Sequence, residues 1–300
     1  MDKLYVVIAG GTGLIGKQLS SHLISKGYEV KILSRQSGDG RIHWDPDQRV
    51  LDASQLEKVH AVINLSGANM AGWLWTSRRK RVLYSSRLNS TTVLVEAINK
   101  LHHPPKVLIN ASAIGYYPDL GDQWQDEAFA PDQDFMGHLC LAWEKALDPL
   151  RPEVRRVWLR TGLVLSRDGG ILPRLRFSFM FKIGVYFGKG DMYYSWIHIE
   201  DICHMIEHLL RQDISGPVNA VAPEPVTMKS FMSALARMHR PAFLFGMPSG
   251  WLKWVLGDFA QVLLKGQRIR PEKILSSGFT FRYPTLISAL AGLFQVPKSI

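Results

Sequence analysis

The sequence has little cysteine and no long apolar run. Its two cysteines, Cys140 and Cys203, give neither a disulfide framework nor a metal-ligand spacing, so they favour a reducing, cytoplasmic setting and no metal site. No uncharged apolar segment is long enough to span a bilayer, and we expect no transmembrane segment. Met1 leads straight into a predicted strand, so we also expect no secretory leader. These absences argue against a secreted disulfide-rich domain and an integral membrane protein.

Acidic residues are scarce in the second half of the chain, which carries the whole net charge of +10. Residues 1–150 contain 16 Lys or Arg and 16 Asp or Glu, whereas residues 151–300 contain 20 and 10. A basic half can serve an anionic substrate, nucleic acid or a membrane surface. Because these basic residues are mostly scattered, an ordinary solvated surface is the favoured interpretation.

A glycine-rich stretch follows the first apolar run. Val6–Ala9 predicts a buried strand, Gly10–Gly16 reads Gly-Gly-Thr-Gly-Leu-Ile-Gly, and helical spacing continues from Leu14 to Lys26. Glycines at such a turn let the backbone approach a pyrophosphate and let the helix pack close to the strand. A glycine turn that binds nothing is the alternative, but the strand and helix on either side favour a dinucleotide site.

The residues after the second predicted strand, Glu29–Leu33, indicate which dinucleotide binds. An acidic side chain there binds the ribose 2′-hydroxyl of NAD, whereas an arginine accepts the 2′-phosphate of NADP. This chain has Ser34 and Arg35, which offer a hydroxyl and a guanidinium. An ordinary surface arginine is the alternative, and we predict NADP.

Apolar runs alternate with helical patterns along the first half of the chain. Ala61–Leu65, Lys106–Ala111 and Val154–Leu165 predict buried strands, and Phe135–Leu147 predicts a helix. Strands that alternate with helices form a doubly wound parallel sheet with right-handed crossovers. We therefore predict an α/β protein with a Rossmann fold.

After Ser166 the pattern changes to basic apolar segments and short helices, which predict a small, mainly helical C-terminal lobe. His198 and Asp201 precede or begin an amphipathic helix, and we expect them to cap it and hold the junction between the two parts. The predicted NADP-binding domain is residues 1–165, rejoined by 191–222, and the predicted lobe is residues 166–190 and 223–300.

The remaining polar and aromatic stretches have structural interpretations. Residues 36–60 predict a loop with one short strand, and the acid-rich residues 119–134 predict a solvated loop. The basic cluster Arg78–Arg81 stands at the start of a helical pattern, and the solvent-exposed face of a helix is a simpler interpretation of it than a nucleic-acid site. Trp251–Leu256 suggests a helix packed on the protein or on a partner subunit rather than one lying on a membrane.

Eight short motifs occur in an order that resembles one family, the atypical extended short-chain dehydrogenase/reductases of the "epimerase family". The resemblance covers almost the whole chain and implies an NADP-binding Rossmann domain with a small C-terminal domain. It is more specific for the fold than for the reaction. The motifs are Gly10–Gly16, Asn64–Gly67, Ser86–Leu88, Ser112–Tyr117, Leu159–Val164, Ser195–Asp201, Gly266–Arg268 and Gly278–Pro284.

The resemblance also implies where the cofactor lies. Arg87 would reach back toward it from a helix, although a solvent-facing residue is the alternative, and Leu163 would line the nicotinamide end. The implied cofactor-binding residues are Gly10, Gly11, Thr12, Gly13, Leu14, Ile15, Gly16, Ser34, Arg35, Leu65, Ser66, Arg87 and Leu163.

The chain departs from the wider superfamily at the proton-transfer residues. Ser112 stands where the superfamily has its catalytic serine, but no Tyr-x-x-x-Lys occurs, and the expected register reads Met136-Gly-His-Leu-Cys140. Tyr116, Tyr117 and His138 are candidate substitutes, although each is more often structural.

Two functions follow from this pattern. The first is an NADP(H)-dependent oxidoreductase or epimerase acting on a small carbonyl or sugar-type molecule, with an anionic substrate as one option and Ser112 orienting the substrate carbonyl. The second is an NADP(H)-binding regulatory or interaction protein without turnover. We favour the first, expect no nucleic acid partner, and leave a homo-oligomer open.

Overall fold

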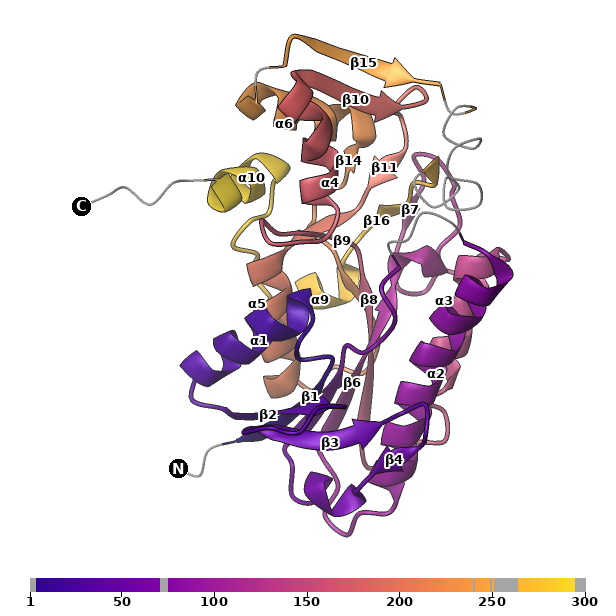
Figure 1. Ribbon diagram of the computed structural model, residues 1–300, viewed down its shortest axis with the longest axis vertical. Helices are drawn as coiled ribbons and strands as arrows, with labels where there is room; N and C mark the ends of the chain where they lie inside the picture. The colour runs from indigo at the N-terminus through magenta and orange to yellow at the C-terminus, as the bar shows by residue number, and fades with distance from the viewer. Residues whose placement is uncertain (1–3, 71–74, 240, 249, 251–263, 295–300) are drawn as a thin grey trace, which may run out of the picture.

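A single eight-stranded sheet forms the centre of the molecule (Figure 1). The computed structural model describes residues 4–70, 75–239, 241–248, 250 and 264–294. The strands lie in the order β13-β8-β6-β5-β1-β2-β3-β4, and all neighbours are parallel except β3 and β4. The strands are β1 Tyr5–Ala9, β2 Glu29–Ser34, β3 Arg41–Asp45, β4 Val50–Leu51, β5 Ala61–Asn64, β6 Val107–Ala113, β8 Arg155–Thr161 and β13 Gly216–Ala220.

Helices cover both faces of this sheet, because its central strands are apolar on both sides. In β1, Val6 and Ile8 belong to the core under one helix pair, whereas Val7 and Ala9 belong to the core under the other. Side chains of a strand alternate between faces, so one short apolar run anchors two layers. The first pair is α1 Leu14–Ser25 and α5 Ile199–Arg211; the second is α2 Ser77–Asn99 and α3 Phe135–Lys145.

The predicted Rossmann fold with a small second lobe is confirmed. Two details differ from the sequence patterns: residues 36–60 contribute two short strands, β3 and β4, and a 3-10 turn, Ala53–Leu56. The edge strand β13 comes from within the 191–222 segment, while the domain boundaries themselves stay a prediction.

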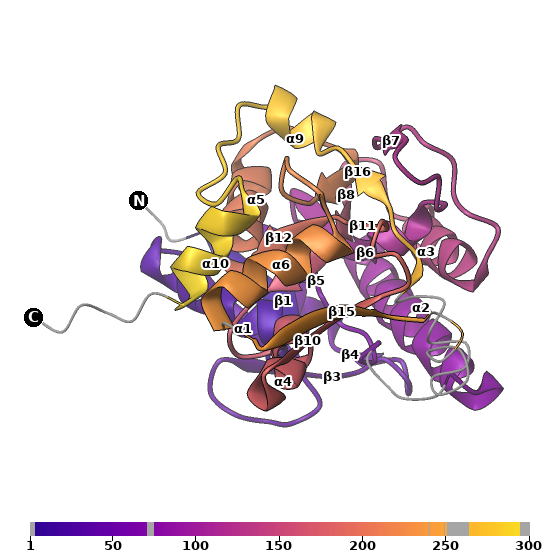
Figure 2. The ribbon, with the colours of Figure 1, turned by 90° about the horizontal axis from the view of Figure 1, so that it is seen from above.

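The lobe mixes helices with short paired strands, which its apolar pattern did not reveal. Figure 1 shows it at one end of the sheet, and Figure 2 looks down on it, with α6 beside α10. The predicted helix at Trp251–Leu256 lies outside the described residues. The remaining elements are 3-10 turns Ile114–Tyr116 and Ser178–Phe181, strands β7 Trp124–Gln125, β9 Leu163–Leu165, β10 Ile183–Phe187, β11 Tyr193–Tyr194, β12 Trp196–His198, β14 Val226–Thr227, β15 Phe243–Met247 and β16 Arg268–Ile269, and helices α4 Leu172–Phe177, α6 Met228–His239, α9 Glu272–Ser276 and α10 Leu286–Phe294.

The start of α5 fixes the C-terminal segment to the sheet layer. His198 caps the helix, because its Nδ1 accepts the Glu200 N–H at 3.1 Å. Burial lowers the pKa of His198 to about 4, so the ring is neutral and able to accept. Asp201 is fully buried, and its two carboxylate oxygens accept the backbone N–H groups of Arg282 and Tyr283 at 2.8 and 3.0 Å. The expected cap is therefore made by His198, and Asp201 ties down the chain after α9.

Replacing Asp201 tests this anchor. We expect Asp201→Ala to lower the free energy of unfolding by about 2–4 kcal/mol, because two buried backbone N–H groups would lose their acceptor. Glu200→Gln is the control on the same helix turn: Glu200 forms an exposed ion pair with Arg282, and its loss is expected to change stability by less than about 1 kcal/mol. Urea denaturation of the three proteins measures both values, and equal effects would contradict the anchoring role.

Candidate functional site

The glycine-rich loop after β1 is shaped by close backbone contacts. Gly10 has a φ of +77°, and a Cβ there would lie 2.7 Å from the Leu65 carbonyl carbon, so only glycine fits. A Cβ on Gly16 would clash with the Gly10 oxygen, since α1 begins directly against the loop. Gly13 differs from both: it is exposed, and a Cβ there would meet only the Gly10 oxygen, at 3.2 Å. The loop therefore packs inward at Gly10 and Gly16 and leaves Gly13 facing open space.

The N-terminus of α1 is free to receive an anion. Gly13 is its N-cap residue and provides no side-chain cap, and the first turn contains no acidic residue. Backbone N–H groups at such a helix end are unsatisfied and attract phosphate. This exposed helix end fits a dinucleotide pyrophosphate.

The rest of the loop joins the sheet to the lobe. A Cβ on Gly11 would lie 2.7 Å from the Ile32 side chain, so the loop packs tightly on β2. Thr12 is exposed, and Leu14 and Ile15 pack against the core that lies under α1 and α5. The lobe turn at Gly169–Gly170 sits beside Leu14, where a Cβ on Gly169 would lie 3.2 Å from Leu14 Cδ1. The lobe thus begins directly over the proposed cofactor loop.

Ser34 and Arg35 lie at the carboxyl end of β2. The Ser34 hydroxyl accepts the Gln36 N–H at 3.0 Å. The Arg35 side chain is 62% exposed and pairs with Asp47 at 2.7 Å, while Asp45 lies 3.9 Å away. The guanidinium therefore reaches solvent at the edge where β2 and β3 end, and it already has an anionic partner.

Leu65 and Ser66 follow β5 and are held by a buried amide network. Asn64 accepts both the backbone N–H and the hydroxyl of Ser66, and its amide donates to Asn110 at 2.7 Å. Arg87 supports the same segment from α2, donating to the carbonyls of Ala68 and Leu83. Burial lowers the pKa of Arg87 to about 10. The Arg87 side chain is thus buried and hydrogen-bonded to the segment after β5, so the alternative of a solvent-facing residue is wrong.

Ser112 and Leu163 lie near the carboxyl ends of the neighbouring strands β6 and β8: Ser112 is the second-to-last residue of β6, and Leu163 follows β8. Leu163 begins β9, which pairs with β12, and its side chain is half-buried against the core under α1 and α5. Ser112 is 3% exposed, and its hydroxyl donates to Glu144 Oε1 at 2.7 Å. The hydrogen that would polarise a substrate carbonyl is therefore directed at a carboxylate of α3.

Glu144 in turn forms a buried ion pair with Arg160 of β8. Two nitrogens of Arg160 donate to the two carboxylate oxygens, each at 2.8 Å, and both side chains are less than 10% exposed. Burial disfavours the charged guanidinium, but the Glu144 carboxylate outweighs this and raises the pKa of Arg160. Such a two-pronged pair is short and directional, so it fixes β8, α3 and Ser112 together.

Both candidate tyrosines pack on the same arginine. The Arg160 guanidinium lies 3.5 Å from the Tyr116 ring centre, and it donates to the Tyr117 hydroxyl at 2.9 Å. Tyr117 donates to Asn219 of β13 at 2.7 Å. Burial raises the pKa of both tyrosines, which makes each phenol a weaker acid than a free one. Neither has the lowered pKa that a proton-exchanging phenol requires at neutral pH.

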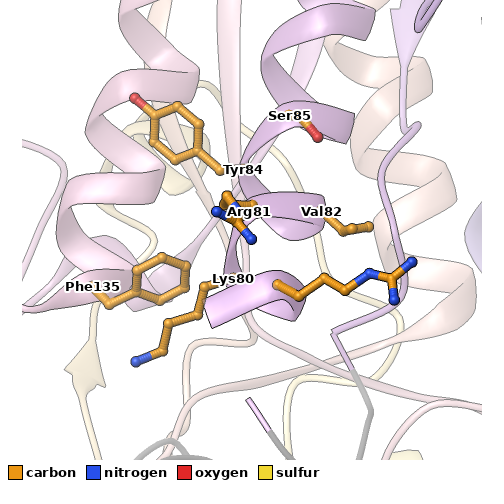
Figure 3. A pocket seen from close by; sticks show the side chains of 7 residues that line it. Lys80, Arg81, Val82, Tyr84, Ser85 and Phe135 are labelled. Carbon is orange, nitrogen blue, oxygen red and sulfur yellow. The ribbon is translucent and has the colours of Figure 1, made fainter. Parts of the chain in front are cut away.

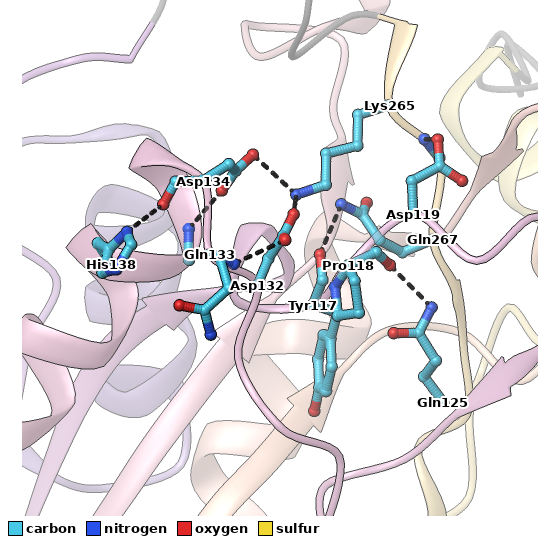
Figure 4. Close-up of polar contacts among 12 residues, drawn as sticks. Tyr117, Pro118, Asp119, Gln125, Asp132, Gln133, Asp134, His138, Lys265 and Gln267 are labelled. Carbon is cyan, nitrogen blue, oxygen red and sulfur yellow. Dashed lines mark hydrogen bonds and ion pairs between the residues drawn. The ribbon is translucent and has the colours of Figure 1, made fainter.

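His138 and the replaced proton-transfer positions lie on α3. His138 is exposed at the first turn, and its Nδ1 lies 2.8 Å from the Asp134 carbonyl oxygen (Figure 4). Met136 and Cys140, in the register of the missing tyrosine and lysine, are buried in a cluster with Leu83 and other apolar residues. Burial raises the pKa of Cys140 to about 12. An apolar cluster thus occupies the place of a proton donor, and His138 lies six residues before Glu144, the α3 residue that contacts Ser112.

Residues 119–134 were expected to be a solvated loop, but they are tied to the lobe. Lys265 pairs with both Asp132 and Asp134, and Gln267 donates to the Tyr117 carbonyl at 3.3 Å (Figure 4). Strand β7 from this loop pairs with β16, and Arg268 stacks on Trp124 with 4.2 Å to the ring centre. Two of the six acids in this segment, Asp132 and Asp134, are paired with a lysine far along the chain, a contact that local composition does not reveal.

The basic cluster at the start of α2 lies on the helix exterior, as predicted. Its side chains surround a surface hollow of about 520 Å³, and the Lys80 ammonium lies 5.4 Å from the Phe135 ring centre (Figure 3). The opposite side of α2 is buried against the sheet. The hollow is lined by Arg78, Lys80, Arg81, Val82, Tyr84, Ser85 and Phe135.

Two further properties concern the described residues only. Within residues 4–70, 75–239, 241–248, 250 and 264–294, no three His, Cys, Asp or Glu side chains are grouped to hold a metal ion. Over the same ranges, no helix combines the length and hydrophobicity needed to cross a membrane.

Comparison with known proteins identifies relatives along nearly the whole chain. Residues 6–143 match the model of the NAD dependent epimerase/dehydratase family, and residues 247–293 match a domain of unknown function. Epimerase family protein SDR39U1 of Mus musculus is 35% identical over 95% of this chain and 98% of its own. Epimerase family protein Mb2239 of Mycobacterium bovis is 38% identical over 97% of both chains.

Solved structures agree with this family relationship. The crystal structure of human epimerase family protein SDR39U1 (isoform 2) with NADPH superposes with a TM-score of 0.89 at 31% identity, covering 96% of this chain and 98% of the human one. The structure of MoeE5 with UDP-glucose and NAD has a TM-score of 0.74 at 20% identity, covering 95% of this chain and 96% of MoeE5, and supports the fold alone.

The Glu144–Arg160 pair makes a testable prediction for stability. We expect Glu144→Gln to lower the free energy of unfolding by about 3–5 kcal/mol, because it leaves a buried guanidinium without its counter-charge. The control is Glu96→Gln, which removes the same charge from an exposed pair with Arg49 and should change stability by less than about 1 kcal/mol. Urea unfolding followed by circular dichroism measures the difference, and similar midpoints for both variants would refute the structural role of the pair.

Proposed function

This chain belongs to the epimerase family of NAD(P)-binding proteins, and we propose that it is an NADP(H)-dependent oxidoreductase for a small molecule with a carbonyl or sugar-type group. The observation that carries the proposal is the glycine loop at the uncapped N-terminus of α1, with Arg35 at the end of the adjacent strand β2. The crystallised human relative is described with NADPH, which supports the same cofactor here.

Different residues of the chain would bind different parts of the cofactor. Gly10–Gly16 would receive the pyrophosphate on backbone N–H groups, and Ser34 and Arg35 would bind the 2′-phosphate. Leu65 and Ser66, which follow β5, would flank the cofactor. Arg87 would hold that segment in place through its hydrogen bond to the Ala68 carbonyl. Leu163 would lie at the nicotinamide end. When bound, NADP(H) supplies a hydride to an acceptor or takes one from a donor.

Ser112 is the polar group best placed to orient a substrate oxygen. Its hydrogen is directed at Glu144, but a serine hydroxyl rotates readily, and Glu144 would keep both bonds from Arg160. A rotated Ser112 could then donate to a substrate carbonyl as negative charge develops there.

Simple reduction or oxidation is favoured over epimerisation. Epimerisation through a transient ketone removes a hydroxyl proton and returns it, so it needs a poised acid and base beside the substrate. Both candidate tyrosines have raised pKa values, and Met136 and Cys140 are buried among apolar side chains. Reduction of a carbonyl takes up one proton beside the hydride, and we infer that water supplies this proton, or accepts it in the reverse oxidation.

Binding without turnover is the second candidate. The specific observation in its favour is that Ser112, Tyr116 and Tyr117 all contact the buried Glu144–Arg160 pair. In such a protein the cofactor-bound and free states would differ in the surface they offer to a partner.

Cofactor choice gives the first test. We expect Arg35→Ala to weaken NADPH binding by about tenfold or more while leaving NADH binding nearly unchanged, because a charge-assisted hydrogen bond contributes about 1.5–3 kcal/mol. Gly13→Val is the matched loss-of-site variant, and it should abolish binding of both cofactors in a folded protein. Titration calorimetry measures the affinities. Equal affinities of the unaltered protein for NADPH and NADH would refute the NADP assignment.

Turnover gives the second test. With NADPH and a panel of aldehydes, ketones and nucleotide sugars, we expect NADPH oxidation with at least one acceptor. Ser112→Ala should lower kcat/KM by about 100-fold and leave the NADPH dissociation constant unchanged, because the hydroxyl would act on substrate rather than cofactor.

Two other variants separate the remaining candidates. An activity that survives Ser112→Ala but is lost in Tyr116→Phe, Tyr117→Phe or His138→Ala would transfer the role to that residue. An absence of turnover across the panel, with NADPH bound, would favour the second candidate.

A further inference from the structure

The cofactor-selecting arginine is already paired with an acid. Arg35 follows β2, and its guanidinium donates to Asp47 Oδ2 at 2.7 Å, while Asp45 Oδ1 lies 3.9 Å from its Nε. Asp47 is 52% exposed and lies in the turn that follows β3. Because β2 and β3 are parallel neighbours, their carboxyl ends bring this acid-bearing turn beside Arg35.

Asp47 is held in place by contacts other than Arg35. Its backbone N–H donates to Asp45 Oδ1 at 3.0 Å, which fixes the turn. Its second carboxylate oxygen accepts from the Asn89 amide of α2 at 3.2 Å. The Asp47 carboxylate is therefore held by the turn after β3 and by Asn89 of α2, in addition to its ion pair with Arg35.

We propose that Asp47 is a specificity-determining residue that competes with the 2′-phosphate of NADP(H) for Arg35. This inference rests on the proposed function. In the free protein the carboxylate takes the guanidinium; in the bound protein the phosphate takes it. Binding of NADP(H) must therefore separate an ion pair, whereas binding of NAD(H), which has no 2′-phosphate, need not.

The direction of the effect follows from charge. A 2′-phosphate carries close to two negative charges at neutral pH, so a fixed carboxylate near the same guanidinium repels it. Removing that charge relieves the repulsion and releases Arg35. Asp47 also orients Arg35, but an exposed ion pair holds a long side chain only weakly, so the loss of orientation is the smaller effect. We expect a gain in NADPH affinity of about three- to tenfold, on the order of an exposed ion pair plus the repulsion.

The experiment compares Asp47→Asn with Glu96→Gln. Asparagine keeps the shape of the side chain and an oxygen for the Asn89 amide, and it removes only the charge. Glu96 of α2 forms a similar exposed pair at 3.0 Å with Arg49, two residues after Asp47 in the same turn, so Glu96→Gln makes the same change in net charge nearby without removing a contact of Arg35 or Asp47. NADPH and NADH are titrated by calorimetry into both variants and the unaltered protein at low and at high salt.

The proposal predicts a specific pattern of affinities. Asp47→Asn should tighten NADPH about three- to tenfold and leave NADH within about twofold, and Glu96→Gln should change neither by more than about twofold. The gain should shrink at high salt, because salt screens an exposed pair. In an Arg35→Ala background the gain from Asp47→Asn should be smaller, since only the direct repulsion between Asp47 and the phosphate would remain to be relieved.

Several results would contradict the proposed competition. Unchanged or weakened NADPH binding in Asp47→Asn, or an equal gain for NADH, would overturn the competition. An effect that persists undiminished in the Arg35→Ala background would overturn the assignment to this ion pair. Failure of the unaltered protein to bind either cofactor would overturn the proposed function and this inference together, whereas normal binding that ignores Asp47 would overturn the inference alone.

Discussion

The buried ion pair between Glu144 and Arg160 ties the carboxyl ends of β6 and β8 to α3. Taking two charges out of water is unfavourable unless every polar atom finds a partner, and here each does. Glu144 binds Ser112 as well as Arg160, and Arg160 also donates to Tyr117 and the Glu127 carbonyl. Three of the four residues that the sequence suggested for chemistry, Ser112, Tyr116 and Tyr117, thus contact this pair.

This dependence explains how the site can keep its shape without a tyrosine and lysine. In a proton-transfer site, a phenol is activated by nearby cations and left open to substrate. Here the cation is drawn into the protein by a carboxylate of α3, and the tyrosines are packed against it. Burial then raises the pKa of both phenols. The two phenols are therefore weaker acids than a free tyrosine, and their contacts with Arg160 and Asn219 join β8, α3 and β13 rigidly.

The glycine loop could be predicted from local sequence, and the polar cluster around Glu144 and Arg160 could not. A strand, a glycine loop and a helix lie within 25 residues, so the spacing of Gly10, Gly13 and Gly16 by itself predicts the turn and the close packing of α1. Glu144 and Arg160 are separated by 16 residues and belong to different elements, and Tyr117 meets Asn219 across 102. Contacts of that kind depend on the packing of the finished fold. The one available signal was an arginine directly after the apolar run Val157-Trp158-Leu159, in Arg160-Thr161-Gly162.

The strand β13 has a consequence for how the molecule is assembled. It is the last strand of the sheet along the chain and covers the edge of β8, yet the segment before it has already built the first part of the lobe. The sheet and the lobe are therefore interleaved along the chain, and no single cut separates them. A fragment that stopped after β9 would leave the β8 edge unpaired, with Val157 and Leu159 deprived of the core that β13 and α5 complete. During synthesis, about fifty further residues must emerge before β13 can pair with that edge, and an unpaired edge is open to pairing with other chains in the meantime.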